Sequence, residues 1–410
     1  MLGKQQSKNY PWVVVGLLWM VALLNYMDRQ MLSTMRPAMQ GDIADLQSAT
    51  NFGYLMAIFL WIYGLMSPLS GIIADKYNRK KLIVGSLLVW SGVTFTMGFA
   101  TTFNQLYLLR AIMGVSEALY IPAGLSLIAD YHSSASRSLA IGLHMTGFYF
   151  GQALGGFGAT VAAKYSWQET FHFFGLIGVG YAIVLLFFLE EKIISKEKRG
   201  VSEDGFRFKK LRSILMNPSF WIILFCFAVV SLPGWATKNW LPTLFSTSLG
   251  IDMSQAGPMA TITIAASSFL GVLMGGILSD RWVQVNIRGR IFTSAIGFAL
   301  TIPSLLLIGF GHSVLSVVAS AFCFGVGYGM IDANNMPILC QFVPAQYRAS
   351  AYGLMNMVGV FAGAVVTNVL GKSTDEGNLG KDFAMLALIV VAALALQLFL
   401  LRPKANEESS

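Results

Sequence analysis

The sequence predicts an all-helical membrane protein with twelve transmembrane helices in two pseudo-symmetric six-helix bundles. Three observations support this fold class: the composition, the length of the apolar blocks and an internal repeat. Of the 410 residues, 55% are hydrophobic and 12% are charged, and the mean hydropathy is +0.63. Soluble domains carry roughly 25% charged residues. A chain with so few charges cannot cover its surface with them, so we expect most of that surface to face lipid.

The apolar blocks are about 20 residues long, enough for a helix to cross a hydrocarbon core of ~30 Å. A polar, charge-rich stretch from Glu190 to about Asn217 separates six blocks from six others. We therefore expect an N-terminal bundle over residues 1–190, a cytoplasmic linker over 191–217 and a C-terminal bundle over 218–410. The expected helices lie near 12–38, 51–74, 82–102, 104–130, 138–163 and 171–190, and near 218–247, 255–279, 290–311, 313–343, 348–371 and 381–402.

An internal repeat supports two related halves. The segment Gly71-Ile-Ile-Ala-Asp75 recurs as Gly276-Ile-Leu-Ser-Asp280, at an offset of 205 residues. The segment Arg137-Ser-Leu-Ala-Ile-Gly-Leu143 recurs as Arg348-Ala-Ser-Ala-Tyr-Gly-Leu354, at an offset of 211. Both offsets are about half the chain, and internal duplication of this kind is typical of transporter folds.

The net charge of +8 reflects membrane topology. Of the 28 Lys and Arg residues, 21 fall in alternate loops and tails that would share one side, and three (Lys164, Lys372 and Lys381) fall on the other. Basic loops remain on the cytoplasmic side, so we expect both termini in the cytoplasm and no nucleic-acid partner. The short outer loops and the lack of an Asn-x-Ser/Thr acceptor favour a multi-pass protein of a bacterial inner (plasma) membrane.

Several other classes find no support in the sequence. The three cysteines, Cys226, Cys323 and Cys340, have unrelated spacings that indicate neither a disulfide framework nor a metal site. No Gly-rich phosphate-binding motif is present, which argues against ATP-driven transport and against a cofactor. The sequence also contains no Ser/His/Asp arrangement that would indicate an enzyme. The fold needs no second subunit, and we expect a monomer.

The local motifs resemble a known family. Gly71-x-x-x-Asp75-x-x-x-Arg79-Lys80-Lys81 resembles the loop between helices 2 and 3 of the major facilitator superfamily, from which it departs at Lys76 and Asn78. The segments Asn25-Tyr-Met-Asp-Arg29, Arg110-Ala-Ile-Met-Gly-Val-Ser-Glu-Ala118 and Trp240-Leu-Pro242 together resemble the anion:cation symporters of that superfamily.

This resemblance implies proton-coupled symport of a small hydroxylated organic anion, such as a hexuronate or an aldonate. The first two segments also occur in spinster-type transporters, so export of a lysolipid or another amphiphile is the alternative. A membrane receptor or scaffold is a third reading, but it would not require duplicated loops. Coupling to sodium instead of protons, and exchange instead of symport, stay open.

Four charged residues in the N-terminal half carry the functional prediction. Charges at membrane depth are costly and are usually paired or functional. Arg29 and Arg110 could grip a carboxylate with their planar guanidinium groups, whereas Asp28 and Glu117 could bind the coupled proton. The resemblance implies the same assignment. The alternative is an inert ion-pair network between the helices at 12–38 and 104–130.

In the C-terminal half, Lys238 is either an interfacial anchor or a cation that faces the substrate anion. Asp332, which Asn335 follows by three residues, could bind substrate hydroxyls, hold a coupling cation or pair with Lys238. We also predict that Tyr26, Tyr63, Gln152 and Asn356 recognise hydroxyl groups, although each could instead bond helix to helix.

A last group is predicted to control conformation without touching substrate. It comprises Asp75, Arg79, Asp280 and Arg281, which lie in the two copies of the repeated loop. We expect their charges to stabilise one access state and to separate in the other.

Overall fold

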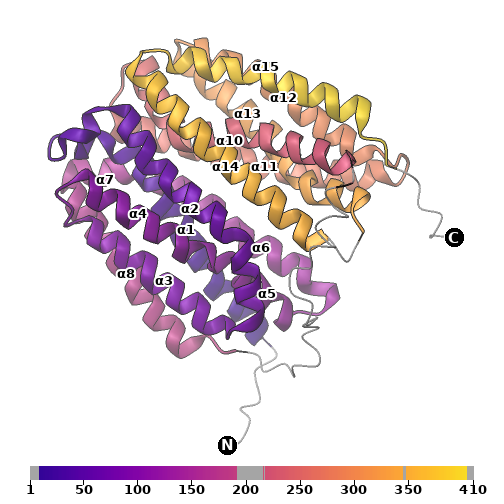
Figure 1. The fold of residues 1–410 in the computed structure, drawn as a ribbon, viewed down its shortest axis with the longest axis horizontal. Coiled ribbons are helices and arrows are strands. Elements are labelled where there is room, and N and C mark those ends of the chain that lie inside the picture. The colour runs from indigo at the N-terminus through magenta and orange to yellow at the C-terminus, as the bar shows by residue number, and fades with distance from the viewer. Residues whose placement is uncertain (1–8, 192–215, 217, 345–347, 404–410) are drawn as a thin grey trace, which may run out of the picture.

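A computed structural model describes residues 9–191, 216, 218–344 and 348–403, and within these residues all regular structure is helical. The predicted fold class of two helical bundles is confirmed (Figure 1). The N-terminal bundle holds α1 (Tyr10–Met39), a 3₁₀ turn (Ala44–Gln47), α2 (Ala49–Lys76), α3 (Arg79–Met97), α4 (Phe103–Ala118), α5 (Tyr120–Tyr131), α6 (Ser134–Gly155), α7 (Gly158–Lys164) and α8 (Trp167–Phe188). The C-terminal bundle holds α10 (Pro218–Leu249), α11 (Met253–Val283), α12 (Gly289–Phe310), α13 (Val314–Phe342), α14 (Arg348–Asp375) and α15 (Leu379–Leu400).

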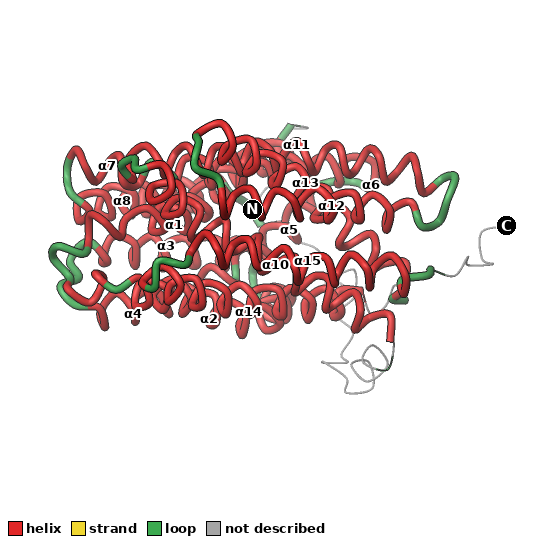
Figure 2. The backbone as a smooth tube through the Cα atoms, turned by 90° about the horizontal axis from the view of Figure 1, so that it is seen from above, coloured by secondary structure: helices red, strands yellow, loops and turns green. Residues whose placement is uncertain are grey.

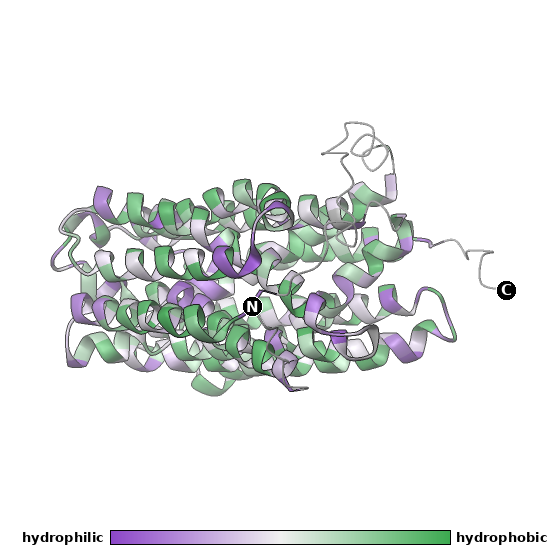
Figure 3. Cartoon of the chain, turned by 90° about the horizontal axis from the view of Figure 1, so that it is seen from below, coloured by the Kyte–Doolittle hydropathy of each residue, from purple (hydrophilic) through white to green (hydrophobic). Residues whose placement is uncertain are grey.

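Ten stretches among the described residues are long and apolar enough to cross a membrane, and one of them combines α4 with α5. The remaining two spans are α3 and α6, which are less apolar because α3 begins with Arg79-Lys80-Lys81 and α6 carries Arg137, His144 and Gln152. Figure 3 shows the helices largely hydrophobic along their length, with hydrophilic stretches gathered mainly at loops and helix ends. The linker expected at 191–217 lies almost entirely outside the described residues.

The predicted helix over 104–130 is interrupted at Leu119, directly after Glu117 and Ala118. Pro122 explains the break, because it has no N–H with which to continue the helical hydrogen bonds from Ala118. The Leu119 N–H instead bonds back to the carbonyls of Ser116 and Glu117. The buried Glu117 therefore lies in the last turn of α4, directly before the discontinuity of the span.

The long helices run between two ends of the molecule, where loops join many of them (Figure 2). Contacts identify each end. At the linker end, α1 begins beside the end of α8, where the Tyr10 hydroxyl donates to the Phe188 carbonyl at 2.8 Å. At the opposite, far end, α1 leads into α2. There Asp42 accepts hydrogen bonds from Trp167 Nε1 at 2.7 Å and Gln168 Nε2 at 2.8 Å. These two hydrogen bonds lower the pKa of Asp42, and the bond from Trp167 has the larger effect.

The largest contacts between the bundles are made by two helix pairs: α2 packs along α14 (Figure 1), and α6 packs against α11. Small residues allow this close approach. A Cβ on Gly53 of α2 would lie 3.0 Å from the Thr367 carbonyl oxygen of α14, and a Cβ on Gly156 would lie 2.9 Å from the Gly257 carbonyl oxygen. Both contacts are at the far end, so the bundles are in intimate contact there.

The far end is also closed by hydrogen bonds between bundles. The Asp375 carboxylate at the end of α14 accepts from the Ser48 hydroxyl at 2.8 Å, the Ala49 N–H at 2.7 Å, the Thr50 N–H at 2.9 Å and the Thr50 hydroxyl at 2.7 Å. It thereby caps the start of α2 from the other bundle, where the helix N-terminus favours negative charge. The Thr160 hydroxyl of α7 adds a bond to the Ser254 carbonyl of α11 at 2.6 Å.

Asp375→Asn is expected to favour the state that opens at the far end. The variant loses the charge that strengthens bonds to two backbone N–H groups, and hydrogen bonds to charged groups contribute about 1.5–3 kcal/mol each. We expect at least roughly tenfold faster thiol labelling from the far side of a single cysteine at Thr237, which lines the central cavity described below. The native cysteines Cys226, Cys323 and Cys340 are replaced first.

Asp252→Asn is the matched control for this prediction. Asp252 also lies at the far end, but it forms no side-chain capping bond at the start of α11. Its removal should leave the labelling rate unchanged. Equal rates in the Asp375 variant and the parent would show that the cap does not hold the far end closed.

Gly151→Ala is expected to destabilise the N-terminal bundle by roughly 1–3 kcal/mol, the usual cost of overpacking a core. The added Cβ would lie 2.2 Å from the Leu23 carbonyl oxygen of α1, so α1 and α6 would have to separate. Gly142→Ala on the same helix is the control, because its Cβ meets nothing within 4 Å and alanine favours helix. Thermal unfolding in detergent should show a lower Tm for Gly151→Ala alone; equal values would contradict the close packing.

Candidate functional site

A cavity of about 370 Å³ lies between the two bundles. Residues of α1, α2, α5 and α6 line it from one bundle, and residues of α10, α11, α13 and α14 line it from the other. Tyr352 lines the cavity only one turn after the start of α14 and is 43% exposed. The cavity therefore extends from the middle of the molecule towards the linker end, while the far end is closed.

Eight predicted site residues line this cavity: Tyr26, Arg29, Tyr63, Gln152, Lys238, Asp332, Asn335 and Asn356. They come from both bundles, although they are far apart in sequence. Three further predicted residues, Asp28, Arg110 and Glu117, do not line it and lie behind it in the N-terminal bundle.

Arg29 and Glu117 form a buried ion pair between α1 and α4. The distance from Arg29 Nε to Glu117 Oε2 is 2.5 Å, and Glu117 is 0% exposed. The guanidinium carbon lies 5.1 Å from the Tyr26 ring centre, 4.8 Å from that of Phe59 and 4.7 Å from that of Tyr63. The arginine of the pair therefore lines the cavity, and the acid lies behind it.

Arg110, which is predicted to bind substrate, does not line the cavity, and its role stays a prediction. Gly114 lets α2 approach α4 closely: a Cβ there would lie 2.8 Å from the Phe59 carbonyl oxygen. The Phe59 ring consequently lies beside both arginines, 4.8 Å from the guanidinium carbon of Arg29 and 4.6 Å from that of Arg110. Arg110 Nη1 contacts Met113 Sδ at 3.0 Å. A substrate in the cavity would meet Arg29 but not Arg110.

Asp28 is likewise enclosed in the N-terminal bundle. It is 5% exposed and accepts a hydrogen bond from the Thr94 hydroxyl of α3 at 3.3 Å. Its neighbours in the chain explain its orientation, since Asp28 and Arg29 project from α1 about 100° apart. Arg29 reaches the cavity, and Asp28 points towards α3.

Lys238 lies in the cavity wall, and its two predicted roles, interfacial anchor and cation that faces the substrate anion, stay predictions. Its ammonium lies 4.9 Å from the Trp235 ring centre, 5.7 Å from that of Tyr26 and 5.9 Å from that of Tyr328. The Lys238 carbonyl accepts from Gln30 Nε2 of α1 at 2.6 Å, which ties α10 to the other bundle. Pro233 and Pro242 interrupt the hydrogen bonding of α10 on either side of this region.

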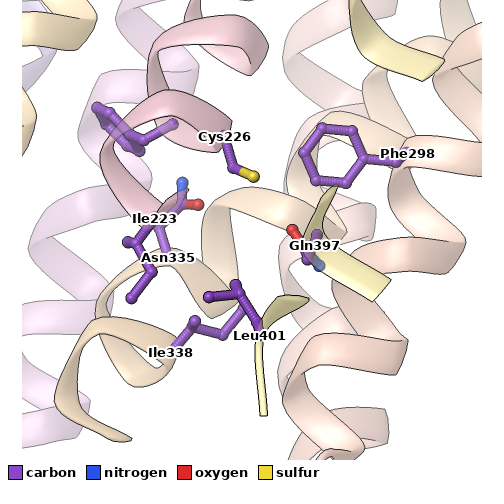
Figure 4. A pocket seen from close by; sticks show the side chains of 8 residues that line it. Ile223, Cys226, Phe298, Asn335, Ile338, Gln397 and Leu401 are labelled. Carbon is purple, nitrogen blue, oxygen red and sulfur yellow. The ribbon is translucent and has the colours of Figure 1, made fainter. Parts of the chain in front are cut away.

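Asp332 on α13 is exposed to the cavity, and Asn335 Nδ2 donates to its Oδ1 at 3.4 Å. Among the described residues no cation lies within ion-pair distance of Asp332, so it does not form the predicted structural pair with Lys238. Asn335 also lines a second, water-sized cavity of about 20 Å³ inside the C-terminal bundle, together with Cys226, Phe298 and Gln397 (Figure 4).

Sequence reasoning did not select several aromatic residues of the cavity, among them Trp235, Tyr328 and Tyr352. A spacing signal could have found them. Trp235 precedes Lys238 by three residues, and Tyr328 and Tyr352 precede Asp332 and Asn356 by four. Residues three or four apart share one face of a helix. Aromatic residues at these spacings from a buried polar residue therefore face the same cavity.

The predicted gating residues lie at the linker end and outside the cavity lining. Arg79 pairs with Asp130 of α5, and the Arg79 and Lys80 N–H groups donate to the Glu191 carboxylate at 3.2 and 2.8 Å. Sequence reasoning did not select Asp130 or Glu191. These contacts all lie within the N-terminal bundle.

In the other bundle, Asp280 of α11 pairs with Arg290 of α12 at 3.7 Å, and Arg281 lies in the last turn of α11. The side chain of Asp75 lies outside the described part of the structure. The contacts of Arg79 and Asp280 thus stabilise the linker end of each bundle separately. Their role in conformational change stays a prediction.

Two helical bundles around one central, charged cavity are the architecture of a membrane transporter. A family model described as Major Facilitator Superfamily matches residues 18–367. The chain belongs to the Major Facilitator Superfamily, and the predicted resemblance is confirmed.

Relatives of known name agree with this class. The chain is 28% identical over 407 residues to "Probable anion transporter 2, chloroplastic" of Oryza sativa subsp. japonica, covering 94% of this chain and 75% of that protein. It is 24% identical over 409 residues to "Probable galactarate/D-glucarate transporter GarP" of Escherichia coli (strain K12), covering 91% of this chain and 90% of that protein.

The fold is also that of a solved structure. A bacterial homologue of the human lysosomal transporter Spinster, in an inward-facing and unoccupied conformation, superposes with a TM-score of 0.79 at 19% sequence identity. The match covers 96% of this chain and 97% of that one. At this identity the likeness concerns the fold alone.

Proposed function

We propose that the chain is a proton-coupled symporter of a small hydroxylated organic anion, such as a hexuronate or an aldonate. The cavity of about 370 Å³ lies within the roughly 300–1,000 Å³ typical of small-molecule sites. Arg29 and Lys238 supply positive charge, and the amides of Gln152, Asn335 and Asn356 supply hydrogen bonds for hydroxyl groups. Such groups are needed because a polyol that enters the cavity loses bonds to water.

The observation that carries this proposal is the Arg29–Glu117 pair at 2.5 Å, with the arginine at the cavity and the acid behind it. A proton that binds Glu117 removes the charge that engages Arg29. The guanidinium can then grip a substrate carboxylate with two parallel hydrogen bonds. Proton and anion binding reinforce each other, and the coupling free energy is reciprocal.

Asp28 and Arg110 act behind this pair in the proposed mechanism. Asp28 is a second group that can bind a proton, and Arg110 acts electrostatically on Glu117 as a positioning residue. The Arg29 guanidinium lies close to the rings of both Tyr26 and Tyr63.

Alternating access follows from the two ends of the molecule. The far end, closed by Asp375, would face the periplasm, and the cavity would then reach towards the cytoplasm. Asp75, Arg79, Asp280 and Arg281 would stabilise the opposite state at the linker end. Both termini and the linker at 191–217 would be cytoplasmic, in an inner (plasma) membrane, and the protein would act as a monomer without a cofactor.

Proteoliposomes test this proposal directly. We expect an inward proton gradient to accelerate uptake of labelled glucuronate or galactonate, whereas a sodium gradient at equal pH should not. Uptake driven by sodium alone would contradict proton coupling. A protein that transports a fluorescent lysolipid but gives no gradient response with any sugar acid would support the amphiphile exporter instead.

A further inference from the structure

Arg29 and Lys238, the two cations that line the cavity, both lie near the ring of Tyr26. The guanidinium carbon of Arg29 lies 5.1 Å and the ammonium of Lys238 lies 5.7 Å from the centre of the Tyr26 ring. Their separation therefore cannot exceed the sum of these distances. Arg29 belongs to α1 and Lys238 to α10, so an anion held by both cations would contact both bundles.

Lys238 is the less engaged of the two cations. Its ammonium lies among the rings of Tyr26, Trp235 and Tyr328. Among the described residues it has no hydrogen-bond or ion-pair acceptor. An ammonium group has three donors, and ring faces attract its charge without accepting classical hydrogen bonds. An anion that enters the cavity can fill this deficit.

Asp332 brings a negative charge into the same cavity. It is exposed there, and its one hydrogen bond in the described structure comes from Asn335 Nδ2 at 3.4 Å. A carboxylate accepts hydrogen bonds and donates none. It can therefore accept a hydrogen bond from a substrate hydroxyl, but it repels a second substrate carboxylate. Placing two like charges opposite each other weakens binding by several kcal/mol.

Charge balance limits the substrate further. The charged side chains that line the cavity or pair with its lining are Arg29, Lys238, Glu117 and Asp332, which sum to zero when all are ionised. In the proposed function one proton on Glu117 leaves one positive charge. That charge balances one substrate carboxylate and not two.

We propose that Asp332 determines specificity: it restricts the substrate to a monocarboxylate with hydroxyl groups at its other end, and excludes dicarboxylates of the same length. This inference rests on the proposed function and names the substrate class of that site. The carboxylate of an aldonate would lie at Arg29 and Lys238, and its hydroxyl chain would extend to Asp332 and Asn335. An element that repels the wrong ligand is a common source of specificity.

The test compares galactonate with galactarate, which differ by one terminal carboxylate. In proteoliposomes with an inward proton gradient, the parent protein should take up galactonate at least about tenfold faster than galactarate. Asp332→Asn keeps the shape and removes the charge, so it should reduce this preference at least about tenfold through faster galactarate uptake. Asp332→Ser removes the same charge with a smaller side chain and should shift the preference in the same direction.

Two variants serve as controls. Asp332→Glu keeps the charge and should keep the preference, and Asp252→Asn removes an acid at the far end and should change neither rate. A parent protein that takes up both substrates equally, or a preference unchanged in both Asn and Ser variants, would overturn the inference and leave the proposed function standing. A parent protein that takes up neither would overturn both.

Discussion

Arg29→Met is expected to lower proton-driven uptake of galactonate or glucuronate by roughly two to three powers of ten. The substitution leaves Glu117, which is 0% exposed, without the partner that now lies 2.5 Å away. In the proposed site it also removes two hydrogen bonds from a charged donor to the substrate carboxylate. Such bonds contribute about 1.5–3 kcal/mol each, and each 1.4 kcal/mol is tenfold in an equilibrium constant. It also removes the planar fork that would hold the carboxylate.

Arg36→Met on the same helix is the matched control. Arg36 donates to the Leu46 carbonyl at 3.0 Å and the Gln47 carbonyl at 2.6 Å at the far end, and it does not line the cavity. Its removal should change uptake by no more than about threefold, because partly exposed polar contacts contribute about 0.5–1.5 kcal/mol. Similar losses in the two variants would mean that Arg29 serves packing and not anion binding.

Glu117→Gln is expected to abolish acceleration of uptake by a proton gradient, while exchange of internal for external substrate survives. The amide mimics the protonated acid in shape and cannot bind or release the proton. Arg29 is then permanently free to bind the anion, so loaded carriers can still change state. We expect the ratio of uptake with and without the gradient to fall to about one, since no proton binding remains linked to anion binding.

Glu169→Gln tests whether removing an acid elsewhere in the protein also abolishes acceleration of uptake by a proton gradient. Glu169 lies exposed in the first turn of α8, far from the cavity lining. Gradient-driven uptake should be retained in this variant. Retained acceleration in Glu117→Gln would move the coupling role to another acid, with Asp28 the next to replace.

The fold could be predicted from sequence because the signals were strong and local. Twelve apolar blocks, one polar stretch and two copies of a loop motif indicate two bundles of six helices. What sequence could not give was the interruption at Leu119, where Pro122 removes a hydrogen bond from an otherwise apolar span. Nor could it show Asp375 capping α2 of the other bundle, because that contact joins residues 325 to 327 positions apart.

Sequence reasoning selected several charged residues that the structure brings to one cavity. Arg29, Lys238 and Asp332 are costly in lipid, and the structure gives each a place at the central cavity. Arg110 is also kept away from lipid, but not at the cavity: it is buried beside the Phe59 ring because Gly114 lets α2 approach α4. Helical spacing places Arg110 and Glu117 on one face of α4, but which neighbouring helix covers that face depends on packing that no single sequence shows.

Protection of cysteines by substrate tests the central claim most directly, namely that a sugar acid binds in the cavity between the bundles. Single cysteines replace Gln152 on α6 and Asn356 on α14 in a protein without its three native cysteines, and a charged thiol reagent measures their labelling rates. Galactonate should slow labelling at both positions. It should leave unchanged the labelling rate of a cysteine at Ser254, which lines a separate crevice at the far end. Unaltered rates at Gln152 and Asn356, in protein that transports galactonate, would place the binding site elsewhere and contradict this account.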